Sequence, residues 1–133
     1  MKINLTSIMV EAADQERALK FYTEILGFKK KAEVPLGKFK WLTVVSADSD
    51  EVELLLEPME FVPAKVFQKA LCDAGIPAKS FSVNNIQNET DRLKKLGVKF
   101  KMEPTNMGMV TVAIFDDTFG NFIQIAALNE LSS

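Results

Sequence analysis

Two stretches of the sequence, RALKFYTEILGFKKKAE at residues 17–33 and DRLKKLGVKFKMEP at residues 91–104, share one pattern. Each is typical of an amphipathic helix that stops at a Leu-Gly pair and is followed by a lysine-rich strand ending near a glutamate. A glycine such as Gly27 is the usual residue just after the end of a helix. The repetition predicts that the chain builds one structural unit twice.

Alternating apolar and polar residues predict strands around both helices, in the same order. In the first half, the expected order is strand, helix and three strands, with Asp14 capping the helix and Pro58 stopping the last strand. The second half repeats this order. The expected strands are residues 3–12, 28–34, 40–47 and 52–58, then 78–84, 98–104, 109–117 and 122–128.

The fold class is therefore α+β, with tandem βαβββ modules that form a curved eight-stranded mixed sheet with a concave cleft. We expect one domain over residues 1–133. Module one covers about residues 3–58, a connecting helix about 62–75 and module two about 76–128, and residues 129–133 are expected to fray. One side of each sheet is expected to face the helices, through the series Leu42/Val44 and Val110/Val112.

Composition excludes several classes of function. The 133 residues carry 16 basic and 18 acidic side chains. The basic residues do not form the stripe that is typical of a nucleic-acid-binding protein. The single cysteine, Cys72, fits a reducing compartment, and no signal peptide or membrane span is expected, so the predicted location is cytoplasmic. The chain has no histidine, which excludes a histidine-based catalytic dyad and any metal site that needs imidazole.

The chain resembles the vicinal oxygen chelate superfamily, which includes glyoxalase I, extradiol dioxygenases, and fosfomycin- and bleomycin-resistance proteins. The resemblance covers roughly residues 3–128. It rests on the order of four motifs: DQERALKFYTEILGF (14–28), VELLLEP (52–58), VNNIQNETDRLKKLGVKF (83–100) and FDDTFGNFIQI (115–125).

The resemblance also implies a site to which each module contributes residues from its first and last strands. The metal-ligand positions of glyoxalase I-like members fall at Ser7, Glu53, Ala78 and Gln124. A one-residue slip in the first strands would substitute Thr6, Ile8, Pro77 or Lys79, none of them a good ligand at neutral pH. Because a divalent cation needs several carboxylate or imidazole donors, we expect no bound metal, no cofactor and no catalytic residue.

Several of the candidate ligand-binding residues have two interpretations. Glu53 is either a buried base or hydrogen-bond acceptor facing a ligand, or a partner of a lysine or of solvent. Gln124 either meets a ligand or bonds a neighbouring strand. Trp41 is either a stacking wall for a ring-bearing ligand or a core residue at a module or subunit interface. The full predicted set is Ser7, Trp41, Glu53, Ser80, Met109, Thr111 and Gln124.

The sequence favours a metal-free protein that binds a small, partly apolar ligand in the cleft between the modules, as bleomycin-resistance-like members sequester a drug. One alternative is a metal-dependent enzyme of this superfamily, a lyase or a dioxygenase. Another is a structural or regulatory protein whose cleft is vestigial. The resemblance also implies a homodimer, with a small molecule as the other partner and neither nucleic acid nor membrane bound.

Overall fold

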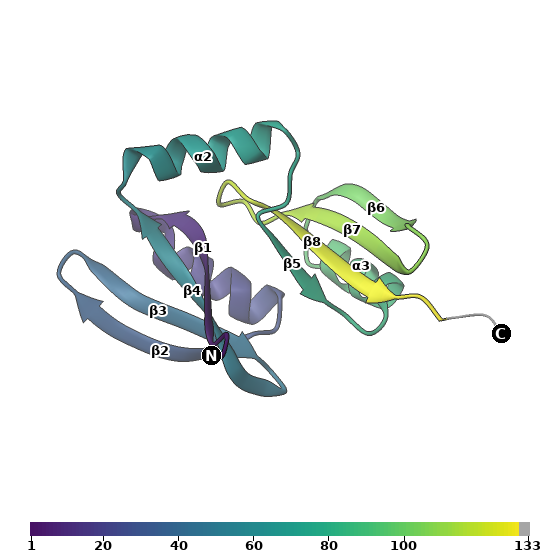
Figure 1. The fold of residues 1–133 in the computed structure, drawn as a ribbon, viewed down its shortest axis with the longest axis horizontal. Helices are drawn as coiled ribbons and strands as arrows, with labels where there is room; N and C mark the ends of the chain where they lie inside the picture. Colours follow the sequence, from purple (N-terminus) through teal and green to yellow (C-terminus); the bar gives the residue numbers. More distant parts are fainter. Residues whose placement is uncertain (131–133) are drawn as a thin grey trace. The chain divides into compact units, whose positions relative to one another are not determined.

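The computed structural model describes residues 1–130, and contacts divide the chain into two compact units, residues 1–68 and residues from 69 onward (Figure 1). The order of elements matches the predicted duplication. The helices and strands are β1 (Leu5–Glu11), α1 (Gln15–Lys20), β2 (Lys29–Leu36), β3 (Phe39–Ser46), β4 (Ser49–Met59), α2 (Val62–Asp73), β5 (Lys79–Ser82), α3 (Ile86–Lys95), β6 (Phe100–Asn106), β7 (Val110–Asp116) and β8 (Phe122–Leu128).

The first unit contains a four-stranded mixed sheet, here called sheet 1, in the order β1-β4-β3-β2. Its first and last strands, β1 and β4, pair in parallel, and β4-β3 and β3-β2 pair antiparallel. The second unit repeats this arrangement as sheet 2, in the order β5-β8-β7-β6, with β5 and β8 parallel. The eight predicted strands are thus present, and the α+β fold class is confirmed.

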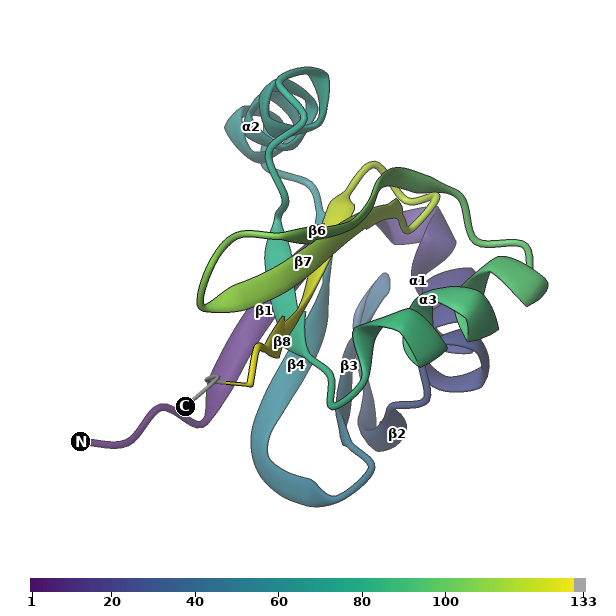
Figure 2. The same ribbon diagram turned by 90° about the vertical axis from the view of Figure 1, so that its right-hand side faces the viewer.

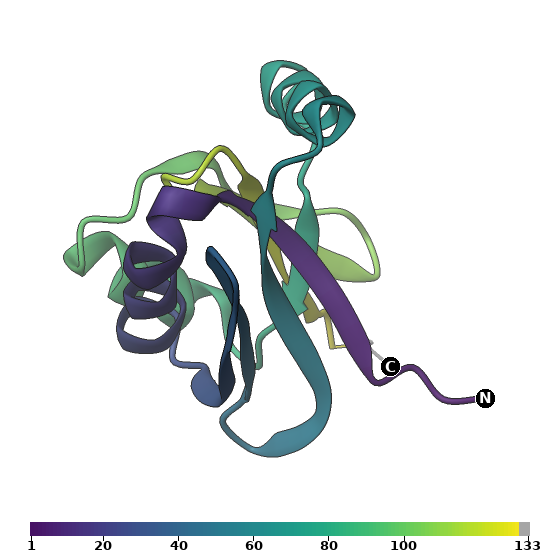
Figure 3. The same cartoon turned by 90° about the vertical axis from the view of Figure 1, so that its left-hand side faces the viewer.

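Helix α1 packs on one side of sheet 1, which we call its helix face (Figure 3). Lys40 lies on this face because its ammonium contacts Glu16 of α1, and alternation along β3 places Leu42 and Val44 on the same side. Both are fully buried, as is Leu56 of β4. The expected contact of the Leu42/Val44 series with the helical side is therefore confirmed.

The segment between β1 and β2 begins with a 3₁₀ turn at Ala12–Asp14 and ends in a π-helical turn at Phe21–Ile25. Gly27 follows with φ +90°, a conformation that glycine adopts without strain, so its predicted role is confirmed. Asp14 precedes α1 but makes no capping hydrogen bond, and its carboxylate instead accepts a hydrogen bond from Arg17 at 2.8 Å.

Pro58 does not end β4, contrary to the prediction. The strand continues to Met59, and Pro58 pairs in register with Val10 of β1. A proline lacks only the amide donor, so it is tolerated where no neighbouring carbonyl requires that donor. The parallel pairing of β1 and β4 therefore continues past Pro58 to Glu11 and Met59.

Helix α3 packs on sheet 2 (Figure 2). Lys94 of α3 lies over the ring of Phe100, with its ammonium 5.9 Å from the ring centroid, and Phe100 pairs with Phe115 of β7. Phe115 and Ala113 therefore define the helix face of β7, and both are fully buried. The predicted placement of Val110 and Val112 against the helix was wrong, because the observed register puts them on the opposite side.

The turn before β8 is built by Asp117, which is fully buried. Its Oδ1 accepts hydrogen bonds from the amides of Phe119 (2.7 Å) and Asn121 (3.1 Å), and its Oδ2 accepts from the Asn121 side chain at 2.9 Å. Asp116 also accepts from the amide of Thr118 at 2.7 Å. These acidic residues shape the turn, as the sequence predicted.

The predicted frayed tail is wrong for Asn129, whose backbone amide donates to Met109 at 2.9 Å and whose side chain donates to Gly108 at 2.8 Å. Residues 131–133 of that tail lie outside the described residues. Cys72 on α2 is half-buried. Within residues 1–130, no helix combines the length and hydropathy that a membrane crossing requires.

Candidate functional site

The side of sheet 1 opposite the helix face, here called its open face, carries three of the predicted site residues. Ser7 is in register with Leu55, and Glu53 is in register with Leu5. Paired residues project to the same side of a sheet, so Ser7 and Glu53 share this face. Trp41 shares it too, because it lies two residues before Thr43, which pairs with Leu55.

A hydrogen bond connects Thr43 of β3 to Glu53 of β4 on this face. The hydroxyl of Thr43 donates to Oε1 of Glu53 at 2.8 Å. Thr43 is fully buried and Glu53 is half-buried. Among the described residues, no lysine or arginine pairs with Glu53. Of the two interpretations of Glu53, the structure therefore supports a hydrogen-bond acceptor over a member of an ion pair.

Trp41 keeps 36% of its surface exposed in the single chain, so its ring is partly accessible. Its two interpretations, a stacking wall for a ligand and a core residue at an interface, stay predictions. It pairs with Val34 of β2, which is also exposed and apolar. Together they form an apolar edge on the open face. An aromatic ring in this setting can contact the flat part of a ligand.

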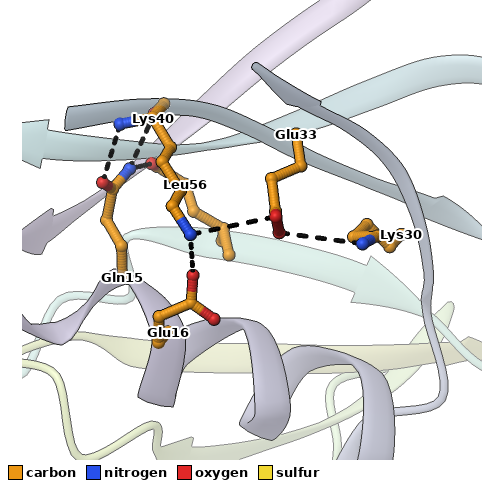
Figure 4. Close-up of polar contacts among 6 residues, drawn as sticks. All are labelled: Gln15, Glu16, Lys30, Glu33, Lys40 and Leu56. Atoms are coloured by element: carbon orange, nitrogen blue, oxygen red, sulfur yellow. Dashed lines mark hydrogen bonds and ion pairs between the residues drawn. The ribbon is translucent and has the colours of Figure 1, made fainter. Parts of the chain in front are cut away.

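Gln15, the first residue of α1, holds β3 and β4 together just before Trp41 (Figure 4). Its Nε2 donates to the carbonyls of Lys40 at 2.9 Å and Leu56 at 3.1 Å, and its Oε1 accepts from the amide of Lys40 at 3.2 Å. Its side chain is almost fully buried, with 5% of the residue exposed. The amide thus satisfies three backbone groups of the two strands.

The side chain of Lys40 adds an ion-pair network on the helix face (Figure 4). Its ammonium contacts Glu16 and lies 3.8 Å from Glu33, which is 3.7 Å from Lys30. The hydrogen bond from Lys40 lowers the pKa of Glu16, and the same bond raises the pKa of Lys40. Lys40 is therefore fixed to α1 through both its backbone and its side chain.

A hollow of about 300 Å³ opens beside the parallel pair β1-β4. Its walls include Met9 and Glu57, which are in register and lie on the open face two residues beyond Ser7 and Leu55. The main lining residues are Met9, Glu57, Pro58, Met59, Glu60 and Phe61. The hollow is thus apolar in its walls and carries two carboxylates.

In the second unit, Ser80 and Gln124 lie on the open face of sheet 2, opposite α3. They are in register on the parallel pair β5-β8, and the Gln124 amide donates to the Ser80 hydroxyl at 3.0 Å. The structure shows the contact of Gln124 with a neighbouring strand, and its contact with a ligand stays a prediction. A hollow of about 280 Å³ near this pair is lined by neutral residues, including Ser82, Asn84 and Leu128.

Thr111 and Met109 do not join these residues. Thr111 pairs with Ala127 on the helix face of sheet 2, and its hydroxyl donates to Asn129 at 2.6 Å. Met109 lies in the turn before β7 and is 75% exposed. Because side chains alternate along a strand, an error of one residue in register reverses the side on which every residue is placed.

The donor groups do not fit a resident divalent cation. At the family's ligand positions, unit one supplies the Glu53 carboxylate and the Ser7 hydroxyl. Unit two supplies the methyl group of Ala78 and the neutral amide of Gln124. Within residues 1–130, no three His, Cys, Asp or Glu side chains gather where they could share an ion. Hard divalent cations need six or more oxygen ligands, and the four family positions supply a single carboxylate.

The residues that sequence reasoning missed are Gln15 and the walls of the hollow in unit one. A polar residue at the start of an amphipathic helix is usually solvated, so Gln15 carries no local signal. Met9 lies two residues after Ser7 in β1, and Glu57 lies four residues after Glu53 in β4, so alternation predicts that both face the open side. Pairing β1 with β4 on this basis would have placed Met9 beside Glu57.

Comparison with known proteins agrees with this fold. The Glyoxalase/Bleomycin resistance protein/Dioxygenase superfamily matches residues 4–125. The protein YurT of Bacillus subtilis (strain 168) is 58% identical, over 94% of this chain and 98% of that protein. The crystal structure of UcmS2 matches this fold with a TM-score of 0.81, and the two sequences are 30% identical. The match covers 95% of this chain and 97% of UcmS2.

TnmS3, an antibiotic binding protein from Streptomyces sp. CB03234, is 24% identical with a TM-score of 0.73, and 97% of each chain is covered. At that identity, the likeness concerns the fold. The match to the family covers nearly the whole chain, with both units included. This chain therefore belongs to the Glyoxalase/Bleomycin resistance protein/Dioxygenase superfamily.

Proposed function

We propose that this protein binds a small, partly apolar molecule against the open face of sheet 1, without a resident metal ion. Trp41 supplies the aromatic contact, and Glu53 supplies the polar anchor. Ser7 adds a hydroxyl between them and the hollow beside β1 and β4. Small-molecule sites have this composition, with apolar walls and a few fixed polar groups.

The observation that carries this proposal is the Thr43–Glu53 hydrogen bond at 2.8 Å. The buried hydroxyl fixes one carboxylate oxygen, while half-burial of Glu53 leaves the group accessible from the open face. A carboxylate accepts several hydrogen bonds and Thr43 supplies one of them. A ligand with an N–H or O–H group can supply another.

Two further points support binding over catalysis. TnmS3, which shares the fold, is an antibiotic binding protein, so the fold can hold a small molecule. The enzymes of the superfamily that the sequence resembles use a metal, and the donors at the corresponding positions here do not fit one.

The test is a thermal-shift screen with small aromatic and amphipathic compounds, followed by titration of the fluorescence of Trp41, the only tryptophan. A compound present at a hundred times its dissociation constant should raise the free energy of unfolding by about 2.7 kcal/mol. It should also change the emission of Trp41, because the ring is part of the site.

Glu53→Gln should weaken a donor-bearing compound by about tenfold, as expected for the loss of a hydrogen bond to a charged group of about 1.5 kcal/mol. The matched control is Glu24→Gln, which removes one exposed carboxylate from the helical segment of the same unit. Equal affinity for both variants, or a screen in which no compound stabilises the protein, would contradict the proposal.

Two expectations from the sequence, a homodimer and a cytoplasmic location, stay predictions. Light scattering coupled to size-exclusion chromatography tests the first, with twice the chain mass of 14.8 kDa as the expected result.

A further inference from the structure

The hollow beside β1 and β4 has an unusual balance of charge and apolar surface. Its walls combine the thioethers of Met9 and Met59 with the ring of Phe61 and the side chain of Pro58. Glu57 and Glu60 are the charged groups among its lining residues, and both are acidic.

Within the described residues, neither Glu57 nor Glu60 forms an ion pair. The neighbouring cation is already occupied, because Lys65, which follows the lining residue Ala64 on α2, lies 3.5 Å from Glu11. The hollow therefore has an acidic lining, and no lysine or arginine among its lining residues offsets the two carboxylates.

The duplication offers an internal comparison. The hollow in the second unit also lies beside the parallel pair made by the first and last strands of its sheet, and it has a similar volume. Its lining has no charged side chain, and the polar groups there are Ser82 and Asn84. The negative charge is thus a property of the first hollow and not a general result of the fold.

We propose that the hollow of the first unit binds the positively charged amine of a partly apolar ligand. This inference rests on the proposed function, since the hollow continues the open face from Ser7 to Met9. It adds the chemical class of the ligand, an organic ammonium attached to an apolar or aromatic body.

An organic ammonium fits this lining better than a metal ion does. Calcium and magnesium require a shell of oxygens, whereas the walls supply two carboxylates and soft thioethers. An alkylammonium instead needs one region of negative charge and an apolar contact for its carbon atoms. Aromatic faces such as Phe61 also attract cations.

The volume sets the size of the group that fits. About 300 Å³ equals the share of roughly ten water molecules in the liquid, so a ring with a short side chain is of suitable size. Phenethylamine, 2-phenylethanol and phenylacetate form a matched series of that size. At neutral pH, phenethylamine is a cation, 2-phenylethanol is uncharged and phenylacetate is an anion.

The test is an NMR titration of the full chain labelled at the methionine methyl groups. Met9 and Met59 line the hollow, whereas Met107 and Met109 are exposed residues of the second unit and serve as internal controls. Phenethylamine should shift the Met9 and Met59 signals and bind at least threefold more tightly than 2-phenylethanol. Phenylacetate should bind more weakly than either.

The double variant Glu57→Gln, Glu60→Gln should weaken phenethylamine by about three- to tenfold, from the usual strength of partly exposed ion pairs, and leave 2-phenylethanol within twofold. Glu51→Gln is the matched control, because it removes a carboxylate from the far end of the same strand. An amide spectrum of each variant that overlays on the parent establishes that the fold is kept.

The outcomes separate this inference from the function on which it rests. If phenethylamine and 2-phenylethanol bind equally at Met9 and Met59, the ligand class is wrong and small-molecule binding stands. If amine binding is unchanged in the double variant, or shifts only Met107 and Met109, the assignment of the hollow is wrong. If no compound of the wider screen affects sheet 1, both proposals fail.

Discussion

Replacing Gln15 with leucine tests how sheet 1 is held together beneath Trp41. The Gln15 amide makes three hydrogen bonds, two to Lys40 and one to Leu56. Leucine fills a similar volume but bonds none of these groups, so the change removes the polar contacts with little loss of packing.

The expected cost follows from the groups left without partners. The bond to Leu56 is buried, and those to Lys40 are partly buried. An unsatisfied buried backbone group costs about 1–3 kcal/mol, and water can reach the partly buried pair at lower cost. We therefore expect Gln15→Leu to lower the free energy of unfolding by about 2–4 kcal/mol.

Urea unfolding followed by Trp41 fluorescence measures this change. Gln87→Leu is the control, because the Gln87 side chain donates to Asp91 on the exposed surface of α3, where such a contact contributes about 0.2–0.5 kcal/mol. The emission of Trp41 in the folded Gln15→Leu variant should also change, since the bonds lost are to the preceding residue. A stability within about 0.5 kcal/mol of the control, with unchanged emission, would refute this reasoning.

Three other perturbations have definite expected results. Leu56→Ala should lower the free energy of unfolding by about 2–5 kcal/mol in the same urea assay, because Leu56 is fully buried against the helix face. Thr118→Gly should raise the melting temperature, since Thr118 has φ +69° and a β-branched residue there costs about 1–2 kcal/mol; a lower temperature would contradict this. Carboxyl NMR should give Glu16 a pKa below its ordinary value of 4.5, and Lys40→Met should return it upward. Because the folded pKa of Glu16 is lowered, its stabilising effect is present at neutral pH and lost as pH falls through that pKa; for Lys40, whose pKa is raised, it is lost as pH rises through the folded value.

The duplicated units were predictable because their signals are local. The glycines of the Leu-Gly pairs that end both helical segments, Gly27 and Gly97, have φ values of +90° and +89°. A glycine directly after an amphipathic helical pattern is the usual signal for this conformation. Alternation along β3 also placed Leu42 and Val44 on one face together. These features depend on neighbouring residues and not on the rest of the fold.

Features that depend on distant residues were harder to predict. The partners of Gln15 lie 25 and 41 residues away in sequence, so nothing near Gln15 indicates its role. The placement of Thr111 depends on the register of β7 against β8, which the alternation of β7 alone does not fix. Both faces of β7 carry buried apolar residues, so hydropathy does not distinguish the side that faces α3.

The most direct measurement of the central claim is an amide NMR map of the compound that stabilises the protein most in the thermal screen. The account predicts saturable shifts in β1, β3 and β4, centred on Ser7, Trp41 and Glu53 and weakened by Glu53→Gln. A screen without a stabilising compound, or a map confined to the helix face around Glu16 and Glu33, would contradict it.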